Sequence, residues 1–482
     1  MTGQVRSVSS AVVLNHKNEA GKIGRVVELL DHFGVAVKLL EPAEFLDDLT
    51  DPTNSGSKSN KHLVATIAGL GLLEELIRES DLRDVTEMFR GTFLFGLDSD
   101  VRSDPILPAC LKSLRGGIRK AASGTELYRV SDCQKEICGP MSGLSIDSTL
   151  AAAPSLFGYG STSESVDPII FCDDGWLFAR IPGRASELFV ATSEDTVELG
   201  AEQRANLQTS NLVSELLPFL LWIRYAFAGS CWEASICGAN LIIDDPLLKP
   251  TYGFLDLSQL LDLVGPDFAA TIGFIPCNHK RTNPIFAEQV RRKYPWFSIC
   301  VHGCFHSRGE FGSRPESELN ELAWLARQGM EKHRELASIP FENIMVFPQG
   351  IFTKKALRCL RRAGYLAAIN TEVRDNACES GVELRELLQP AVLCHGGTPL
   401  LTRRNVTDDI SSFALDLLIG KPCLLVAHHD FFREGMSSLI SLLSALNSLS
   451  APLSWTNLES ILRQNYWTRE NGSNEYSIIA AS

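Results

Sequence analysis

Residues 297–306 read FSICVHGCFH, an apolar run that ends in a His-Gly pair and is followed four residues later by a second histidine. The run Phe297–Val301 predicts a buried strand that delivers side chains to its own carboxyl end. His302 and His306 lie four residues apart, so a helical turn would place both imidazoles on one face, where they could bind one metal ion. The segment therefore predicts half of a metal site at the end of a strand.

Two further apolar runs end in residues of the same chemical types. Asp244-Asp245 follows the run 241–243, and His428-His429-Asp430 follows the run 423–427. Adjacent carboxylates behind a buried strand are costly to desolvate without a cation. Three strands that each end in aspartate or histidine indicate one shared site.

The C-terminal half alternates strands with helices and predicts a seven-stranded β/α barrel over residues 236–482, with its active residues at the strand carboxyl ends. The expected strands are Leu241–Ile243, Ala270–Ile275, Ser298–Val301, Ile344–Phe347, Leu366–Ile369, Ala391–Cys394 and Cys423–Ala427. The expected helices are Leu257–Val264, Phe286–Lys293, Glu316–Leu336, Lys354–Ala363, Ile410–Leu418 and Met436–Leu446. Further polar residues are expected to line the substrate site or support the metal ligands: Asn278, Arg281, Arg308, Glu310 and Gln349.

Residues 1–124 alternate short apolar runs with helical patterns, which predicts a parallel α/β domain, flavodoxin-like or Rossmann-like in outline. It contains neither G-x-G-x-x-G nor a P-loop, so we expect a role in structure or in homo-oligomer assembly. Residues 125–235 form short β-like runs and predict a β-rich domain with a helical linker. Within it, 169–179 predicts a hairpin that turns at Asp173-Asp174-Gly175, and turn geometry alone explains those aspartates.

Composition and charge limit the partners and the cellular location that we expect. The chain of 482 residues has 45 Lys and Arg against 58 Asp and Glu, a net charge of -13, and no long basic run, so nucleic acid is not expected to bind. Thirteen cysteines without a C-x-x-C pair predict free thiols in a reducing compartment. The N-terminus lacks an apolar signal core, and the apolar stretch 212–229 contains Glu215 and Arg224, so we expect a cytoplasmic protein without a membrane span.

These motifs, in this order, resemble the polysaccharide deacetylase (NodB-like, carbohydrate esterase family 4) superfamily, in its divergent bacterial branch. The resemblance covers the C-terminal half and rests on Asp244-Asp245, His302-x-x-x-His306, Phe347-Pro348-Gln349-Gly350 and Leu425-x-x-His428. It implies a divalent metal, most simply Zn²⁺, with Co²⁺, Ni²⁺ or Mn²⁺ as alternatives.

The resemblance also implies roles for individual residues. Asp245, His302 and His306 would bind the metal, Asp244 would be the general base and His428 the general acid. His429 is a rival for the acid role, and Asp430 could orient either imidazole.

The chain departs from the family pattern in three places. Pro246 follows Asp245 without the usual glycine, and no Asp-x-x-Asp-Trp motif occurs. Val346 and Phe347 occupy the place of the arginine that orients the catalytic aspartate in the family.

The predicted function is a metal-dependent hydrolase that removes an acetyl or related acyl group from an amino sugar or glycan. One alternative is a metal-free glycoside hydrolase that uses Asp244 and Glu310, which would require carboxyl groups roughly 5 to 9.5 Å apart. The other is a noncatalytic carbohydrate-binding or assembly protein with a degenerate barrel, which the missing arginine favours.

Overall fold

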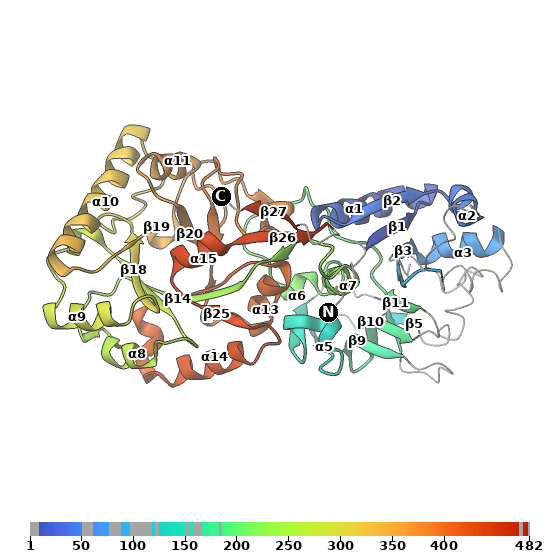
Figure 1. Ribbon diagram of the computed structural model, residues 1–482, viewed down its shortest axis with the longest axis horizontal. Helices are drawn as coiled ribbons and strands as arrows, with labels where there is room; N and C mark the ends of the chain where they lie inside the picture. The colour runs from blue at the N-terminus through green and yellow to red at the C-terminus, as the bar shows by residue number, and fades with distance from the viewer. Residues whose placement is uncertain are drawn as a thin grey trace, which may run out of the picture. The chain divides into compact units, whose positions relative to one another are not determined.

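The computed structural model describes residues 9–50, 61–76, 88–96, 118–120, 125–149, 155–158, 166–182, 186–471 and 476–480. The chain divides into two compact units. Unit 1 comprises residues 1–199, 207–233 and 468–478, and unit 2 comprises 200–206, 234–467 and 479–482. Each unit has its own large sheet (Figure 1).

Unit 1 contains an 11-stranded sheet in the order β2-β1-β3-β4-β11-β10-β9-β6-β7, with β8 pairing β10 and β5 pairing β8. Its strands are β1 Ser10–Leu14, β2 Ala36–Leu40, β3 Lys61–Thr66, β4 Gly91–Phe95, β5 Ile118–Lys120, β6 Thr125–Val130, β7 Ser145–Thr149, β8 Ser155–Phe157, β9 Asp167–Cys172, β10 Gly175–Pro182 and β11 Glu187–Ala191. Its helices are α1 Ala20–His32, α2 Pro42–Thr50, α3 Ile67–Leu76, α5 Lys135–Cys138, α6 Thr209–Leu212 and α7 Leu217–Ala226.

The strands β1 to β4 pair in parallel, as the alternating pattern of residues 1–124 predicts. However, β4 also pairs in parallel with β11. Strands from both sides of the boundary expected near residue 124 therefore belong to one sheet.

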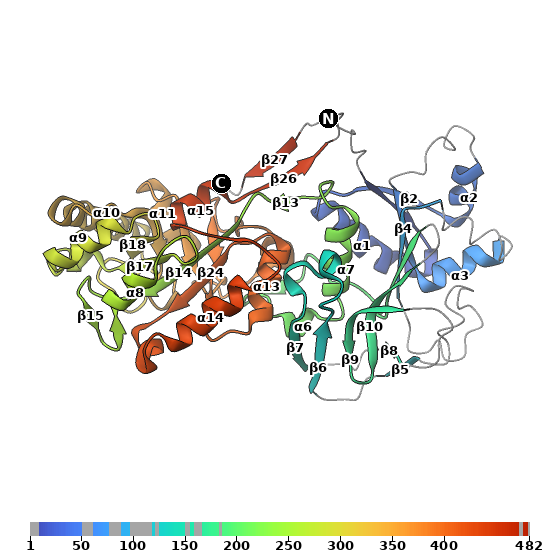
Figure 2. The ribbon, with the colours of Figure 1, turned by 60° about the horizontal axis from the view of Figure 1, so that its bottom comes forward.

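The predicted hairpin is present as β9 and β10, which pair antiparallel and run side by side in Figure 2. Its two aspartates are exposed, and Asp173 forms an ion pair with Arg129. The apolar stretch 212–229 folds mostly as the short buried helix α7. In the described part of the chain, no helix has both the length and the apolar character that crossing a membrane requires.

Unit 2 is an α/β barrel whose parallel strands do not fully close. The sheet has the order β22-β20-β19-β18-β17-β14-β24-β23, and β25 also pairs β14. Its strands are β14 Cys237–Asp244, β17 Ala270–Phe274, β18 Phe297–His302, β19 Glu342–Val346, β20 Ala367–Asn370, β22 Leu400–Thr402, β23 Arg404–Asn405, β24 Cys423–Ala427 and β25 Leu453–Trp455. Strand pairs of two residues each lie outside it: β12 Glu202–Gln203 with β21 Val382–Glu383, and β15 Thr251–Tyr252 with β16 Leu255–Asp256.

Helices return the chain between the barrel strands, close to the ranges expected from the apolar periodicity (Figure 1). They are α8 Leu257–Leu263, α9 Pro284–Arg292, α10 Glu316–Ala337, α11 Lys354–Arg362, α12 Leu384–Leu387, α13 Ile410–Ile419, α14 Ser437–Asn447 and α15 Leu458–Gln464. Several begin at a side chain that accepts hydrogen bonds from the first-turn amides, which fixes where the helix starts. These N-caps are Asp256, Asn283, Thr353, Asp409 and Asn457.

One expected strand is wrong and the strand count is larger than expected. Ala391–Cys394 is not a strand, because Val392 makes only an isolated bridge to Leu400, and the strand that pairs with β20 is β22. The sheet has nine strands rather than seven, since β23 and β25 are too short to give a pattern. His395 consequently lies buried, with Nε2 2.8 Å from the carbonyl oxygen of Val373.

Candidate metal centre

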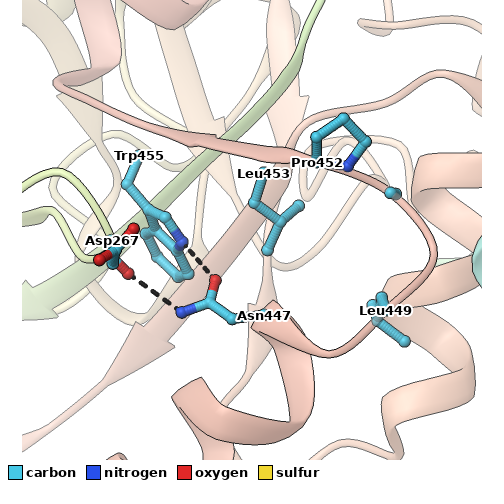
Figure 3. A pocket seen from close by; sticks show the side chains of 7 residues that line it. Asp267, Asn447, Leu449, Pro452, Leu453 and Trp455 are labelled. Atoms are coloured by element: carbon cyan, nitrogen blue, oxygen red, sulfur yellow. Dashed lines mark hydrogen bonds between the residues drawn. The ribbon is translucent and has the colours of Figure 1, made fainter.

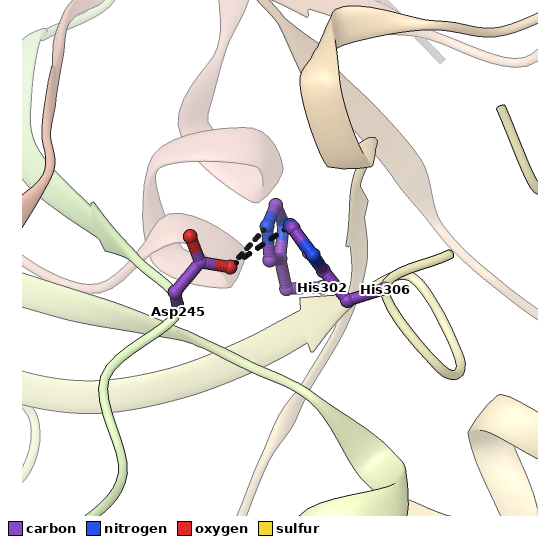
Figure 4. A group of neighbouring side chains, drawn as sticks. All are labelled: Asp245, His302 and His306. Atoms are coloured by element: carbon purple, nitrogen blue, oxygen red, sulfur yellow. Dashed lines mark ion pairs between the residues drawn. The ribbon is translucent and has the colours of Figure 1, made fainter. Parts of the chain in front are cut away.

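Three side chains converge at the carboxyl ends of two barrel strands. Asp245 follows the last residue of β14, and His302 is the last residue of β18. Nε2 of His302 lies 3.2 Å from Oδ1 of Asp245, and Nε2 of His306 lies 3.0 Å from the same oxygen. Figure 4 shows both imidazoles directed at this carboxylate. The structure thus brings together the three residues expected as metal ligands.

The protonation of His302 is constrained by a backbone contact. Its Nδ1 lies 3.1 Å from the carbonyl oxygen of Val346, an acceptor that requires the proton on Nδ1. In the neutral imidazole, Nε2 then turns its lone pair toward Asp245, whose Oδ1 is buried without a hydrogen-bond partner among the described residues. The electron pairs of Nε2 of His302 and Oδ1 of Asp245 therefore face each other, and a cation that Nε2 of His306 also contacts would satisfy both. Carboxylate and imidazole are ordinary ligands for Zn²⁺ and related ions, so the residues present fit a divalent metal.

Two of the three residues have a left-handed backbone. Asp245 has φ 78° and His306 has φ 60°. Such values are uncommon for residues other than glycine, although aspartate and histidine adopt them more often than most. Backbone strain of this kind is typical of functional sites, where the surrounding structure holds it in place.

Glu310 fixes the loop between the two histidines. It is buried, and its carboxylate accepts hydrogen bonds from the amides of Cys304 at 2.8 Å and Phe305 at 3.1 Å. Gly303 has φ 63°, and a Cβ there would lie 1.9 Å from Oε1 of Glu310, so only glycine fits. The carboxylate therefore sets the turn that returns His306 toward His302.

Asp244 forms a buried ion pair that sequence reasoning missed. Nη1 and Nη2 of Arg403 donate to Oδ1 and Oδ2 of Asp244 at 2.9 and 2.6 Å, and the two side chains are 4% and 3% exposed. Arg403 directly follows β22, and Asn206 donates to its carbonyl oxygen at 3.2 Å. An arginine thus orients this aspartate, although it follows β22 and does not occupy Val346 or Phe347, where the family pattern places it. The adjacent pair Arg403-Arg404 after an apolar run was the only sequence signal for it.

The charges in the site favour ionised carboxylates. Burial raises the pKa of Asp244, but Arg403 and His302 outweigh it, so the pKa lies below its ordinary value. Burial likewise raises the pKa of Asp245, and the contact with His302 and the charge of His306 lower it further than burial raises it. For His302, burial lowers the pKa, but the two aspartates raise it above the ordinary value. The shift at His302 indicates that the two aspartates concentrate negative charge around its ring, which favours a cation there.

The pair His428-His429 separates into two environments. His428 follows β24, is exposed, and is close enough for its charge to lower the pKa of Asp244. The ring of His429 instead packs against Tyr252 and Phe254, with centroids 5.7 and 6.1 Å apart. In the described structure no hydrogen bond joins Asp430 to either imidazole.

The remaining polar candidates lie on loops that follow β17, β18 and β19. Nη1 of Arg281 donates to Oδ1 of Asn278 at 3.1 Å, so these two residues contact each other. Arg308 is exposed on the loop that carries His306. Gln349, with φ 56°, accepts a hydrogen bond from the amide of Gly309 at 3.3 Å. No described contact joins these side chains to Asp245, so their part in the site stays a prediction.

The glycoside hydrolase alternative finds little support in these contacts. One of its two carboxylates is already engaged, because Glu310 is buried and accepts hydrogen bonds from two backbone amides. A surface pocket elsewhere in the barrel offers no chemistry of its own (Figure 3). It lies at the amino ends of β17 and β25, away from the triad, where Asn447 links Trp455 to the carbonyl of Asp267.

Comparison with known proteins gives a limited result. No family model matches the chain, and no curated protein matches it. Among solved structures, it is similar to one from Mycobacterium smegmatis that is described as a polysaccharide deacetylase. The two chains are 14% identical with a TM-score of 0.35, and the match covers 48% of this chain and 90% of the other. It is also similar to a family 4 carbohydrate esterase from Streptomyces lividans, with 10% identity, a TM-score of 0.26, and coverage of 44% and 86%.

A third similar structure is a family 4 carbohydrate esterase pseudoenzyme from Bacillus anthracis, with 11% identity, a TM-score of 0.31, and coverage of 49% and 68%. The structural neighbours thus include carbohydrate esterase family 4 deacetylases and pseudoenzymes. At these identities and TM-scores, the similarity does not indicate an activity for this chain.

Proposed function

We propose that this chain is a metal-dependent hydrolase that removes an acetyl or related acyl group from an amino sugar or glycan. The observation that carries the proposal is the convergence of two imidazole Nε2 atoms on one carboxylate oxygen, at 3.0 and 3.2 Å, beside a second carboxylate held by an arginine. Asp245, His302 and His306 would hold a divalent cation, which would supply Lewis acidity and would bring the pKa of a water that it binds to about 7.

The chain's own residues have separate tasks in this proposal. Asp244 is the general base, because Arg403 and His302 keep it ionised and a buried carboxylate in a fixed orientation can accept the proton of an attacking water. His428 is exposed at the end of β24 and donates a proton to the departing amine or alkoxide. His429 supports the neighbouring hairpin through ring contacts instead.

Arg403 weakens the case for a degenerate, noncatalytic barrel. That alternative drew support from the absence of an arginine at Val346 and Phe347. The bidentate pair between Arg403 and Asp244 supplies the same contact from β22.

Metal analysis of the purified protein tests the proposal. We expect about one equivalent of zinc or another divalent metal in the wild type, and loss of that metal in Asp245→Ala and His306→Ala. Chelation should abolish acetate release from acetylated sugars, and added metal should restore it. Gly265→Ala, on a loop where a Cβ meets nothing within 4 Å, is a control that should keep the metal. A wild type that binds no metal after reconstitution contradicts the proposal.

A further inference from the structure

Two free thiols on different loops meet beside the metal triad. Cys277 lies in the short helix η5 Pro276–Asn278, which follows β17, and Cys304 lies in the turn between His302 and His306. The amide of Cys277 donates to the carbonyl oxygen of Cys304 at 3.3 Å, and a further hydrogen bond joins the two thiols. The two sulfur atoms are therefore in contact, although no covalent bond links them.

The backbone geometry of this pair permits a disulfide. Amide–carbonyl bonds between neighbouring strands bring facing Cα atoms to about 4.5 to 5.5 Å, and the Cα atoms of a disulfide are usually about 4.4 to 6.8 Å apart. A bond of this kind joins Cys277 to Cys304, and their side chains already meet. Rotation of the two side chains is therefore enough to bring the sulfurs to bonding distance.

Both loops hold their cysteine in this position. A Cβ on Gly329 of α10 would lie 2.7 Å from Cβ of Pro276, so η5 packs directly on that helix. On the other loop, the amide of Cys304 donates to the buried carboxylate of Glu310 at 2.8 Å. The contact between the thiols is thus fixed by packing on one side and by a hydrogen bond on the other.

The two thiols differ in their access to solvent. Cys277 is exposed, whereas Cys304 is 1% exposed. A reagent from solution can reach the first sulfur but not the second, which can react only with a group already attached to Cys277. An accessible cysteine beside a second, resolving cysteine is the arrangement of redox-sensitive sites. The exposures therefore set the order in which the two thiols would react.

We propose that Cys277 and Cys304 are a modification site, where a low-molecular-weight disulfide such as oxidised glutathione forms a reversible disulfide that restrains the turn carrying His306. In the first step, the sulfur of Cys277 attacks one sulfur of oxidised glutathione, and the glutathione thiolate that leaves takes up the proton from Cys277. In the second step, the sulfur of Cys304 attacks the sulfur of Cys277, and the second glutathione leaves with the proton from Cys304. The two cysteines lose two electrons, and one glutathione disulfide becomes two thiols.

The bond would cross-link the middle of the turn from His302 to His306 to η5. That turn must move away from Asp245 before a bound metal can leave, and a cross-link removes opened conformations from those available to the chain. The disulfide is independent of the proposed hydrolysis, because neither thiol has a part in it. The restraint rests on the metal centre of the proposed function.

Peptide mass spectrometry of the full-length protein tests the disulfide. Burial raises the pKa of the Cys277 thiol, so reduced protein is incubated with oxidised glutathione at about pH 8.5, where more thiolate is present. Trypsin cuts after Lys280 and Arg281, between the two cysteines, so a disulfide appears as a linked pair of peptides. We expect this linked pair in the wild type and its loss on treatment with dithiothreitol.

Two variants and an internal control separate the steps. Cys304→Ser should stop at a glutathione adduct on Cys277, with its fold checked by circular dichroism. Cys277→Ser, at an exposed position, should leave Cys304 unmodified. Cys378 is a matched exposed thiol whose sulfur lies 2.9 Å from Oγ of Ser380, so it should give an adduct and no linked peptide. Adducts on Cys277 of the wild type without the linked peptide, or no reaction there, overturn the disulfide.

Transfer of zinc to a chelator tests the restraint. Zinc-loaded wild type with the disulfide should release zinc at least about 10-fold more slowly than reduced wild type, and Cys277→Ser after the same treatment should match the reduced protein. Equal release by linked and reduced protein overturns the restraint. A wild type that binds no zinc contradicts the restraint together with the proposed function, whereas the linked peptide still decides the disulfide by itself.

Discussion

Replacing Arg403 by methionine isolates the ion pair behind the triad. Methionine keeps much of the buried stem but removes both hydrogen bonds to Asp244, at 2.9 and 2.6 Å. The carboxylate then stays buried without its cation, since both side chains are at most 4% exposed. Breaking a buried pair by removing one partner typically costs about 3 to 5 kcal/mol, and we expect a loss of this size in the free energy of unfolding at pH 7.

The loss should depend on pH in a defined direction. In the wild type, the pKa of Asp244 is depressed, so its contribution to stability is present above the unfolded pKa of about 3.9 and is lost as pH falls through the folded value. Without Arg403, burial dominates and raises the folded pKa, so the variant loses stability as pH rises above about 3.9. The difference between the two proteins should therefore shrink below pH 4. In the proposed hydrolase, the acid limb of kcat/KM should also move to higher pH, because Asp244 must be ionised to act as base.

Denaturant unfolding of metal-free protein at several pH values measures the first effect, and a pH profile of acetate release measures the second. Arg404→Met is the matched control, since Arg404 forms an equally buried bidentate pair with Asp416, at 2.6 and 2.8 Å. It should lose stability but keep the acid limb of the wild type. A cost below about 1 kcal/mol for Arg403→Met, or an acid limb that stays in place, refutes the reasoning.

Two further substitutions test a buried acid in the barrel core and a close contact beside the site. Burial raises the pKa of Glu342 to about 7, so the free energy of unfolding of the wild type should fall by about 3 kcal/mol as pH rises from 4.5 through 7. Glu342→Gln should not show this fall. Unfolding at pH 5 and pH 8 measures the change in each protein, and an equal change in both would contradict the expectation. Gly273→Ala places a Cβ 3.0 Å from Oδ1 of Asp244 and 3.4 Å from His302, so we expect at least about 10-fold weaker zinc binding in a chelator competition, with the fold retained by circular dichroism. Zinc affinity equal to that of Gly265→Ala would refute the second expectation.

Most barrel elements could be predicted because the six strands that were expected correctly are almost entirely buried and read as short apolar runs. The failure at Ala391–Cys394 has the same origin, since this run is also apolar and Ala391 and Val392 are buried, but it packs in the core outside the sheet. Hydrophobicity reports burial, and burial alone does not distinguish a strand from a packed loop. The three-residue strand Leu400–Thr402 was missed for want of length.

In the candidate site, local patterns predicted that several strand ends share one site, and the family resemblance selected Asp245, His302 and His306; neither revealed the contacts that support them. Asp245, His302 and His306 follow strand ends, and parallel strands bring those ends together at one rim. The ion pair between Arg403 and Asp244 could not be predicted, because 159 residues separate the two and only the folded sheet brings them together. The different environments of His428 and His429 likewise depend on a hairpin that packs against the ring of His429.

The left-handed backbone at Asp245 and His306 restricts how this site can change over generations. Besides aspartate and histidine themselves, glycine and asparagine adopt this backbone most readily; glycine has no side chain to bind a metal, and the neutral amide oxygen of asparagine is a weaker ligand than a carboxylate or an imidazole for Zn²⁺. Most other residues add backbone strain to the loss of the ligand. A descendant that abandons the metal should therefore show Gly or Asn at these two positions first, and such a pair in a homologous chain would record a lost centre in an otherwise intact barrel.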